Sequence, residues 1–201
     1  MRTPVVDAGQ IAPLIRSLCL DDAVKRAQAA TEIFTRGSQM AREVARDWLA
    51  DPRIANLLVQ GPVGSLETTV GVAVEPDTFE RLRSANGSPR LADVPPDQDA
   101  REFELEFARG VRLDILTTRL PGGEGAIARY LLKFGEGIQQ VEINVTDVDR
   151  ATELLHAKFG LKPVYPVTRA GADGRRVNFL LVPRPDGGKI LIELVESASK
   201  S

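Results

Sequence analysis

Polar side chains alternate with apolar ones along IQQVEINV, residues 138–145. Val141 and Ile143 fall on one face of the strand that this pattern predicts, and the other face carries Gln140, Glu142 and Asn144. Such a polar row is either the solvated face of a half-buried sheet or the floor of a binding site. The second interpretation makes these three residues candidates for substrate binding.

A second stretch, KILIELVE at 189–196, sets one carboxylate among aliphatic side chains. Glu193 shares its strand face with Leu191 and Val195, which is unlike a freely solvated face. A partly enclosed carboxylic acid has a raised pKa and can transfer protons. We therefore expect Glu193 to act as a catalytic acid or base, and Gln140 to line the same cavity.

A third alternating strand, REFELEF, places Glu102, Glu104 and Glu106 on one face. The opposite face carries Phe103, Leu105 and Phe107, and we expect that apolar face to pack against a core. A solvated acidic stripe explains at least two of the three glutamates. The register of the strand does not show which of them, if any, faces a site.

Composition excludes several classes of protein. The chain has 201 residues, 43% of them hydrophobic, 27% charged, and a formal net charge of -2. This balance provides no positive field for nucleic acid or for an anionic membrane, so the expected partner is a small molecule. One cysteine, Cys19, allows no internal disulfide, and no apolar run reaches spanning length, so we expect a cytoplasmic protein.

The periodicity changes near residue 60. Segment 1–60 is predicted to be helical: apolar residues recur every three to four positions from Asp22 onward, with Gly37 as a possible break. Asp51-Pro52 predicts the start of another helix over 53–59. A linker over 60–65 follows, and the domain at 67–197 has mainly the two-residue period of strands.

That domain divides into two similar modules. In module 136–197, a strand leads to the helix VDRATELLHAKF, which ends at Gly160, and to three strand candidates: KPVYPVTRA, RRVNFLLVP and KILIELVE. Module 67–120 has a strand, a short helix, a loop-like stretch at 86–99 that could hide a degenerate strand, and a hairpin. Two tandem β-α-β-β-β units predict an α+β protein whose modules form one cup-shaped mixed sheet.

The run GEGIQQVEINVTDVDRATELL, with GADGRRVNFLLVPRPDGGKILIELVE after it, resembles the second half of methylmalonyl-CoA epimerases. These enzymes belong to the glyoxalase, or vicinal oxygen chelate, superfamily. The resemblance covers roughly 68–197, is strongest over 124–196 and excludes the N-terminal helices. It implies a divalent metal that stabilises an enolate, with a nearby carboxylate to move the proton.

The resemblance also implies four metal-ligand positions, two in each module. In this sequence they fall on Thr69, Asp114, Gln140 and Glu193. Histidines are expected at the first and third positions, and both are replaced here. The four side chains now at these positions, one hydroxyl, one amide and two carboxylates, favour loss of the metal. A metal that was retained would be Mg, Mn or Ca rather than Zn, because every donor atom is oxygen. Asp114 could instead pair with an arginine.

The resemblance further implies an acid or base from the strand REFELEF, for which Glu104 or Glu106 is the nearest counterpart. We assign Glu104, together with Glu193, as catalytic, and add Asn178 to the substrate-binding residues. The expected function is a divergent isomerase, epimerase or lyase that enolises a small carbonyl or acyl-thioester substrate. Alternatives are a metal-free protein that sequesters a small molecule in the same cup, and an interaction protein that uses its N-terminal helices. Those helices either pack outside the sheet or form a homodimer interface.

Overall fold

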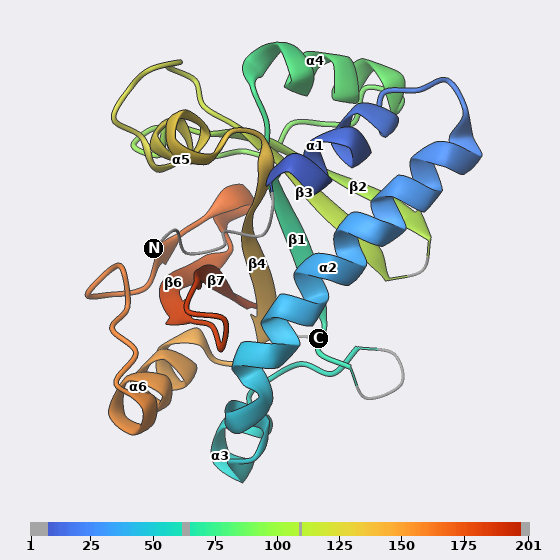
Figure 1. Cartoon of the computed structure of the whole chain (residues 1–201). Helices are drawn as coiled ribbons and strands as arrows, with labels where there is room; N and C mark the ends of the chain where they lie inside the picture. Colours follow the sequence, from blue (N-terminus) through green and yellow to red (C-terminus); the bar gives the residue numbers. More distant parts are fainter. Residues whose placement is uncertain (1–7, 62–64, 109, 198–201) are drawn as a thin grey trace.

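The computed structural model describes residues 8–61, 65–108 and 110–197 (Figure 1). Residues 1–7 of the expected helical segment and 62–64 of the expected linker lie outside this part. The strands are β1 (Thr68–Ala73), β2 (Arg101–Ala108), β3 (Val111–Thr117), β4 (Gly137–Val145), β5 (Arg169–Ala170), β6 (Arg176–Pro183) and β7 (Lys189–Glu196). The helices are α1 (Ala8–Ser17), α2 (Ala23–Leu49), α3 (Pro52–Ala55), α4 (Pro76–Ala85), α5 (Ala126–Phe134) and α6 (Val148–Phe159).

All seven strands join one curled, mixed sheet in the order β2-β3-β1-β4-β7-β6-β5. Within the modules, β1 runs parallel to β3 and β4 runs parallel to β7. The modules meet where β1 and β4 pair antiparallel. The predicted α+β fold is therefore confirmed, with the strands closest to the module junction at its centre.

The main core lies between the outer, convex face of the sheet and the helices. Val70, Ile143 and Leu194 belong to it, as do side chains of α1, α2, α4 and α6. Figure 1 shows α2 crossing this face, and it contacts β1, β3 and β4. A smaller apolar cluster, which includes Ala73, Leu116 and Leu131, covers one end of the concave face. The rest of the concave face is left for polar side chains.

Helix ends largely follow the sequence signals. Asp22 accepts hydrogen bonds from the first free backbone N–H groups of α2, and Asp147 does the same for α6. Gly160 ends α6 with a positive φ of 65°, as expected. Asp51 caps α3 with Pro52 at its first position, but α3 ends at Ala55 rather than continuing to residue 59. Helix α1 lies within the segment 1–60 that was expected to be helical, although no bounds had been predicted for it.

Two strand expectations differ from the structure. Residues 86–99 form no strand, so the possible degenerate strand of the first module is absent there. In the second module only Arg169–Ala170 of KPVYPVTRA pair as a strand, apart from a bridge at Pro163. Pro163 and Pro166 have no N–H groups to donate, which limits regular pairing over this segment.

The possible helix break at Gly37 was wrong, because α2 runs unbroken for 27 residues. Gly37 is needed for close packing instead. A Cβ atom at this position would lie 2.6 Å from both methyl carbons of Val70. The glycine therefore brings α2 directly onto the central strand β1.

We expect Gly37→Ala to lower the free energy of unfolding by about 1–2 kcal/mol. Alanine favours a helix interior by up to about 1 kcal/mol, but overpacking typically costs about 1–3 kcal/mol. Urea denaturation measures the difference. In a Val70→Ala background the same change should be neutral or stabilising, and additive effects in this double-mutant cycle would contradict the proposed contact.

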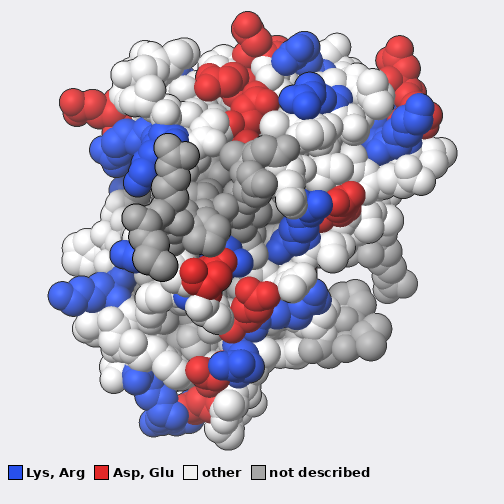
Figure 2. All heavy atoms as spheres, in the orientation of Figure 1, with Lys and Arg blue, Asp and Glu red and all other residues white. Residues whose placement is uncertain are grey.

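No helix within the described ranges is long and apolar enough to cross a membrane. On the face shown in Figure 2, basic and acidic side chains are interspersed. That face offers no broad patch of a single charge.

Candidate functional site

The central strands bring five predicted site residues together on the concave face. Glu142 on β4 lies opposite Thr69 of β1 and beside Glu193 of β7. The side chains along a strand alternate between faces, so residues at matching register share one face. Asp114 and Gln140 are paired in register with Gly71 of β1. We call this group the cup: Thr69, Asp114, Gln140, Glu142 and Glu193.

Gln140 and Glu193 are in direct contact. The Gln140 Nε2 atom donates a hydrogen bond to Glu193 Oε2 at 2.6 Å. Gly71 leaves the space for this side chain, because a Cβ there would lie 2.5 Å from Gln140 Cγ. Both polar side chains are more than nine-tenths buried. A buried, hydrogen-bonded carboxylic acid of this kind is suited to proton transfer.

The acidic residues perturb one another. Burial raises the pKa of Asp114 and Glu193 well above the usual range, and neighbouring carboxylates raise it further. Burial also raises the pKa of Glu142, while Arg175 lowers it. The charge of Glu142 is one of the causes that raise the pKa of Asp114. The cup is therefore a coupled set of acids.

Glu102 of β2 joins this set from the first module. Burial and the charge of Glu142 raise its pKa to about 7. Glu104 lies on the same strand face, but its side chain is exposed, as is that of Glu106. Glu104 is paired in register with Asp114, and its charge raises the pKa of Glu142, so the expected residue does lie beside the cup. Glu102, two positions earlier on the same strand face, is the more enclosed of the two.

Arg175 forms an ion pair with Glu142 of the cup. Its Nη1 atom lies 3.6 Å from Glu142 Oε2, an oxygen that has no hydrogen-bond partner. The Arg175 side chain is 41% exposed and that of Glu142 only 3%. The guanidinium thus lies where the buried acids meet the exterior.

The remaining predicted residues differ in placement. Asn144 lies on the concave face, where it pairs in register with Val195. Asn178 lies on the opposite face of β6, where its side chain hydrogen bonds with the backbone of Tyr165. The structure therefore does not bring Asn178 together with the cup. Its amide instead holds the proline-rich segment that lacks regular pairing.

Sequence reasoning missed Glu102, Gly71 and the position of Arg175. A signal for Arg175 was present, because Arg175 and Arg176 are neighbours at the start of a strand. Neighbouring side chains of a strand point to opposite faces, so one of the two arginines had to point toward the concave face. Arg176 pairs with Asp149 and Glu196 on the helix side. For Glu102 the sequence carried no signal, since three glutamates share its face.

Ion pairs and hydrogen bonds join the two modules beside the cup. Arg90 pairs with Asp173 at 2.6 Å, and Arg169 pairs with Asp97. Asp173 also accepts a hydrogen bond from the Asp93 backbone, and these partners lower its pKa to about 2. We call this set of contacts the module bridge. It anchors the turn from which Arg175 projects.

The residues of the cup do not fit the divalent metal that the fold family implies. Among the described residues, no group of three or more His, Cys, Asp or Glu side chains is arranged to hold a metal. Thr69 and Gln140 offer only neutral oxygens, which are weak donors, and the Gln140 amide donates to Glu193.

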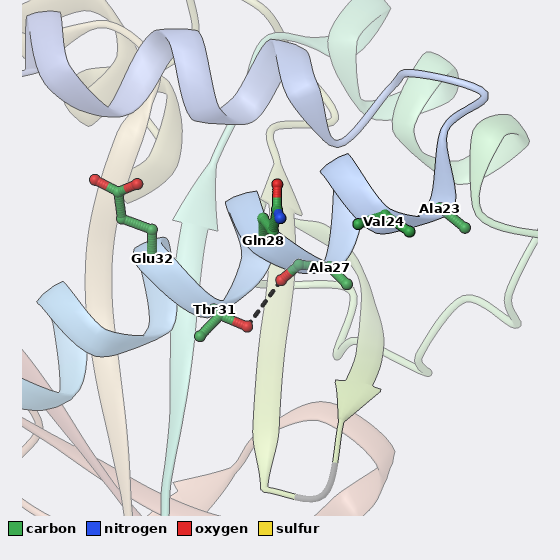
Figure 3. A pocket seen from close by; sticks show the side chains of 6 residues that line it. All are labelled: Ala23, Val24, Ala27, Gln28, Thr31 and Glu32. Carbon is green, nitrogen blue, oxygen red and sulfur yellow. Dashed lines mark hydrogen bonds between the residues drawn. The ribbon is translucent and has the colours of Figure 1, made fainter.

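A shallow depression of about 570 Å³ lies along α2, away from the cup (Figure 3). Its lining comes from α2 alone: Ala23, Val24, Ala27, Gln28, Thr31 and Glu32. Val24 is exposed there, but the surrounding residues include polar and charged groups. This surface does not form the broad apolar patch that the interaction hypothesis requires.

The raised pKa values predict that stability falls as pH rises. Folded Glu102 binds its proton up to about pH 7, whereas an unfolded glutamate releases it near 4.5. Its stabilising contribution is complete below pH 4.5 and is lost as pH rises through 7. We expect the free energy of unfolding to drop by about 1–3 kcal/mol between pH 5 and 8.

Urea denaturation across this pH range measures the effect. Glu102→Gln should flatten the dependence, while Glu106→Gln, on the exposed part of the same strand, should leave it unchanged. A stability that rises steadily from pH 5 to 8 would contradict the assignment.

The curled sheet of two modules, with a polar site on its concave face, defines a glyoxalase or vicinal oxygen chelate fold. Comparisons with models of protein families and with curated proteins found no match. Solved structures do match. Methylmalonyl-CoA epimerase from Mycobacterium tuberculosis is 31% identical, with a TM-score of 0.54 over 72% of this chain and 95% of that one. The chain therefore belongs to the methylmalonyl-CoA epimerase family.

Two further matches carry ligands. A variant of the Streptomyces coelicolor methylmalonyl-CoA epimerase, in complex with 2-nitronate-propionyl-CoA, is 27% identical, with a TM-score of 0.51 over 67% of this chain and all of that one. A methylmalonyl-CoA epimerase in complex with methylmalonyl-CoA and NH4+ is 28% identical, with a TM-score of 0.51 over 67% and 97%. These structures show that relatives of the chain bind acyl-CoA molecules.

Proposed function

We propose that the chain is an enzyme that moves a proton at the carbon next to the carbonyl of an acyl-CoA thioester. The observation that carries the proposal is the buried Glu193, held by Gln140, on the concave face of a fold whose relatives bind acyl-CoA. Epimerisation, isomerisation and elimination all begin with this step. The fold family alone does not select among them.

Glu193 is the principal acid and base of the proposed reaction. In its ionised form it takes the proton from the α-carbon, and the electron pair of the broken C–H bond moves toward the thioester oxygen. Gln140 holds one Glu193 oxygen and so orients the carboxylate. Asp114, on the same concave face, is proposed to position the substrate oxygen.

Glu102 is proposed as the second acid or base, in place of Glu104. It reaches the cup from the edge strand β2, which β3, β1 and β4 separate from β7. Two acids from separate modules can serve opposite sides of a planar enolate, and an epimerase needs proton transfer on both sides. The raised pKa of Glu102, about 7, suits exchange near neutral pH.

A cup that holds an apolar ligand by sequestration would be lined mainly by apolar side chains. Here Glu193 is paired in register with Glu142, and its charge interacts with those of Asp114 and Arg175. A cup with several acids is better suited to proton transfer than to holding an apolar ligand. No specific observation favours sequestration.

Exchange of the α-proton tests the proposal. The protein is incubated with methylmalonyl-CoA in D2O, once with EDTA and once with added Mg, Mn, Co or Ni, and deuterium uptake is followed by NMR. Catalysed exchange supports enolisation. Tight binding of the thioester without exchange under every condition would contradict it and support sequestration instead.

A further inference from the structure

A positively charged side chain, Arg175, lies beside the acids of the cup. Arg175 lies 3.6 Å from Glu142, and its charge also acts on Glu193 and Asp114. In the fold family the corresponding positive charge comes from a metal, yet the donor set here does not fit one. A guanidinium is permanently charged and carries five N–H donors in a planar fork.

Arg175 keeps donors for a ligand. Its nearest carboxylate oxygen lies beyond ordinary hydrogen-bond length, and no side-chain hydrogen bond of Arg175 occurs within the described residues. Its neighbour Arg176, by contrast, donates to both Asp149 and Glu196. The two adjacent arginines thus have different environments: Arg176 is hydrogen-bonded on the helix side, whereas Arg175 forms only the longer ion pair with Glu142.

The backbone around Arg175 is well anchored. Its carbonyl accepts a hydrogen bond from the Gly171 N–H at 2.7 Å, and its own N–H donates to Ala172. Asp173, in the same turn, is held by Arg90 through the module bridge. A guanidinium on a fixed turn loses little freedom when a ligand binds.

We propose that Arg175 binds and stabilises the oxyanion of the enolised thioester, in place of the metal that this fold family uses. The inference rests on the proposed function. As the α C–H bond breaks, its proton passes to a carboxylate of the cup and its electron pair forms the C=C bond of the enolate. The carbonyl π electrons move to the thioester oxygen, which the guanidinium N–H groups receive.

Binding of 2-nitronate-propionyl-CoA tests this role, because its nitronate is an anion that resembles the enolate. Calorimetry on EDTA-treated protein compares the wild type with Arg175→Gln, Arg175→Lys and Arg176→Gln. We expect Arg175→Gln to weaken nitronate binding about 10- to 100-fold. Affinity for propionyl-CoA, whose carbonyl is neutral, should change less than about threefold, which a general structural defect would not produce.

The controls separate charge from geometry. Arg175→Lys should show intermediate affinity, because lysine keeps the charge but not the planar fork, and it also serves if the glutamine variant fails to fold. Arg176→Gln should bind like the wild type, since exposed ion pairs contribute little.

Two outcomes would overturn the inference, and they have different consequences. Nitronate binding that requires added Mn or Co, and persists in Arg175→Gln, would assign the cation role to a metal and leave the proposed function standing. Absence of both nitronate binding and α-proton exchange, with or without metal ions, would remove the proposed function as well.

Discussion

Glu193→Gln is expected to lower the rate of α-proton exchange by about 10²- to 10⁴-fold, the usual contribution of a general acid or base. The variant keeps the shape of the side chain and an oxygen that can accept from the Gln140 amide. It removes only the ability to take and return a proton. Exchange of methylmalonyl-CoA in D2O, followed by NMR, measures the loss.

The controls for this variant address fold and binding. Glu153→Gln removes an exposed carboxylate on α6 that pairs with Arg150, and should leave exchange unchanged. Affinity of Glu193→Gln for propionyl-CoA should remain within a few-fold of the wild type. Unchanged exchange in Glu193→Gln would show that another group takes the proton, and Glu102→Gln would then identify or exclude the acid on β2.

Trp48→Ala is expected to lower the free energy of unfolding by about 3–5 kcal/mol, a cost typical of truncating a buried tryptophan. Trp48, at the end of α2, is 2% exposed and belongs to the same core cluster as Ile143 and Leu194 of the sheet. The N-terminal helices are thus part of the core of the sheet. Urea denaturation followed by circular dichroism measures the loss.

Trp48 is the only tryptophan of the chain, so its fluorescence reports directly on α2. In the wild type, the fluorescence and circular dichroism transitions should coincide, as in a cooperative two-state unfolding. Val24→Ser, on the exposed side of α2, should change stability by less than about 0.5 kcal/mol. Two separate transitions would show that the helices form an independent unit, which would renew the interaction hypothesis.

Local signals in the sequence were sufficient for most of the fold. Alternation with a period of two located β4 and β7 and placed Gln140, Glu142 and Glu193 on matching faces. Capping chemistry located the ends of α6, because Asp147 and Gly160 satisfy backbone groups of their own helix. These features depend on neighbours in the chain, so a linear pattern contains them.

Packing between distant segments decided the rest. Gly37 looked like a helix break and is instead a contact with Val70. Asn178 was assigned to substrate binding, but it pairs in register with the core residue Leu194 and donates a hydrogen bond to Tyr165 on the helix side. The apolar residues on both faces of β6 gave no pattern that could show this. Both outcomes depend on which segment lies opposite, and a single strand or helix pattern does not specify that.

The charges of the site depend most on the tertiary structure. Alternation put Glu102, Glu104 and Glu106 on one face, but only the assembled sheet encloses Glu102 and leaves the other two exposed. Arg175 and Glu142 are 33 positions apart in the sequence. They come together because the module bridge holds the turn that carries Arg175 beside β4. Residue types showed that acids and cations were present, whereas their burial and distances, which set their pKa values, follow from folding.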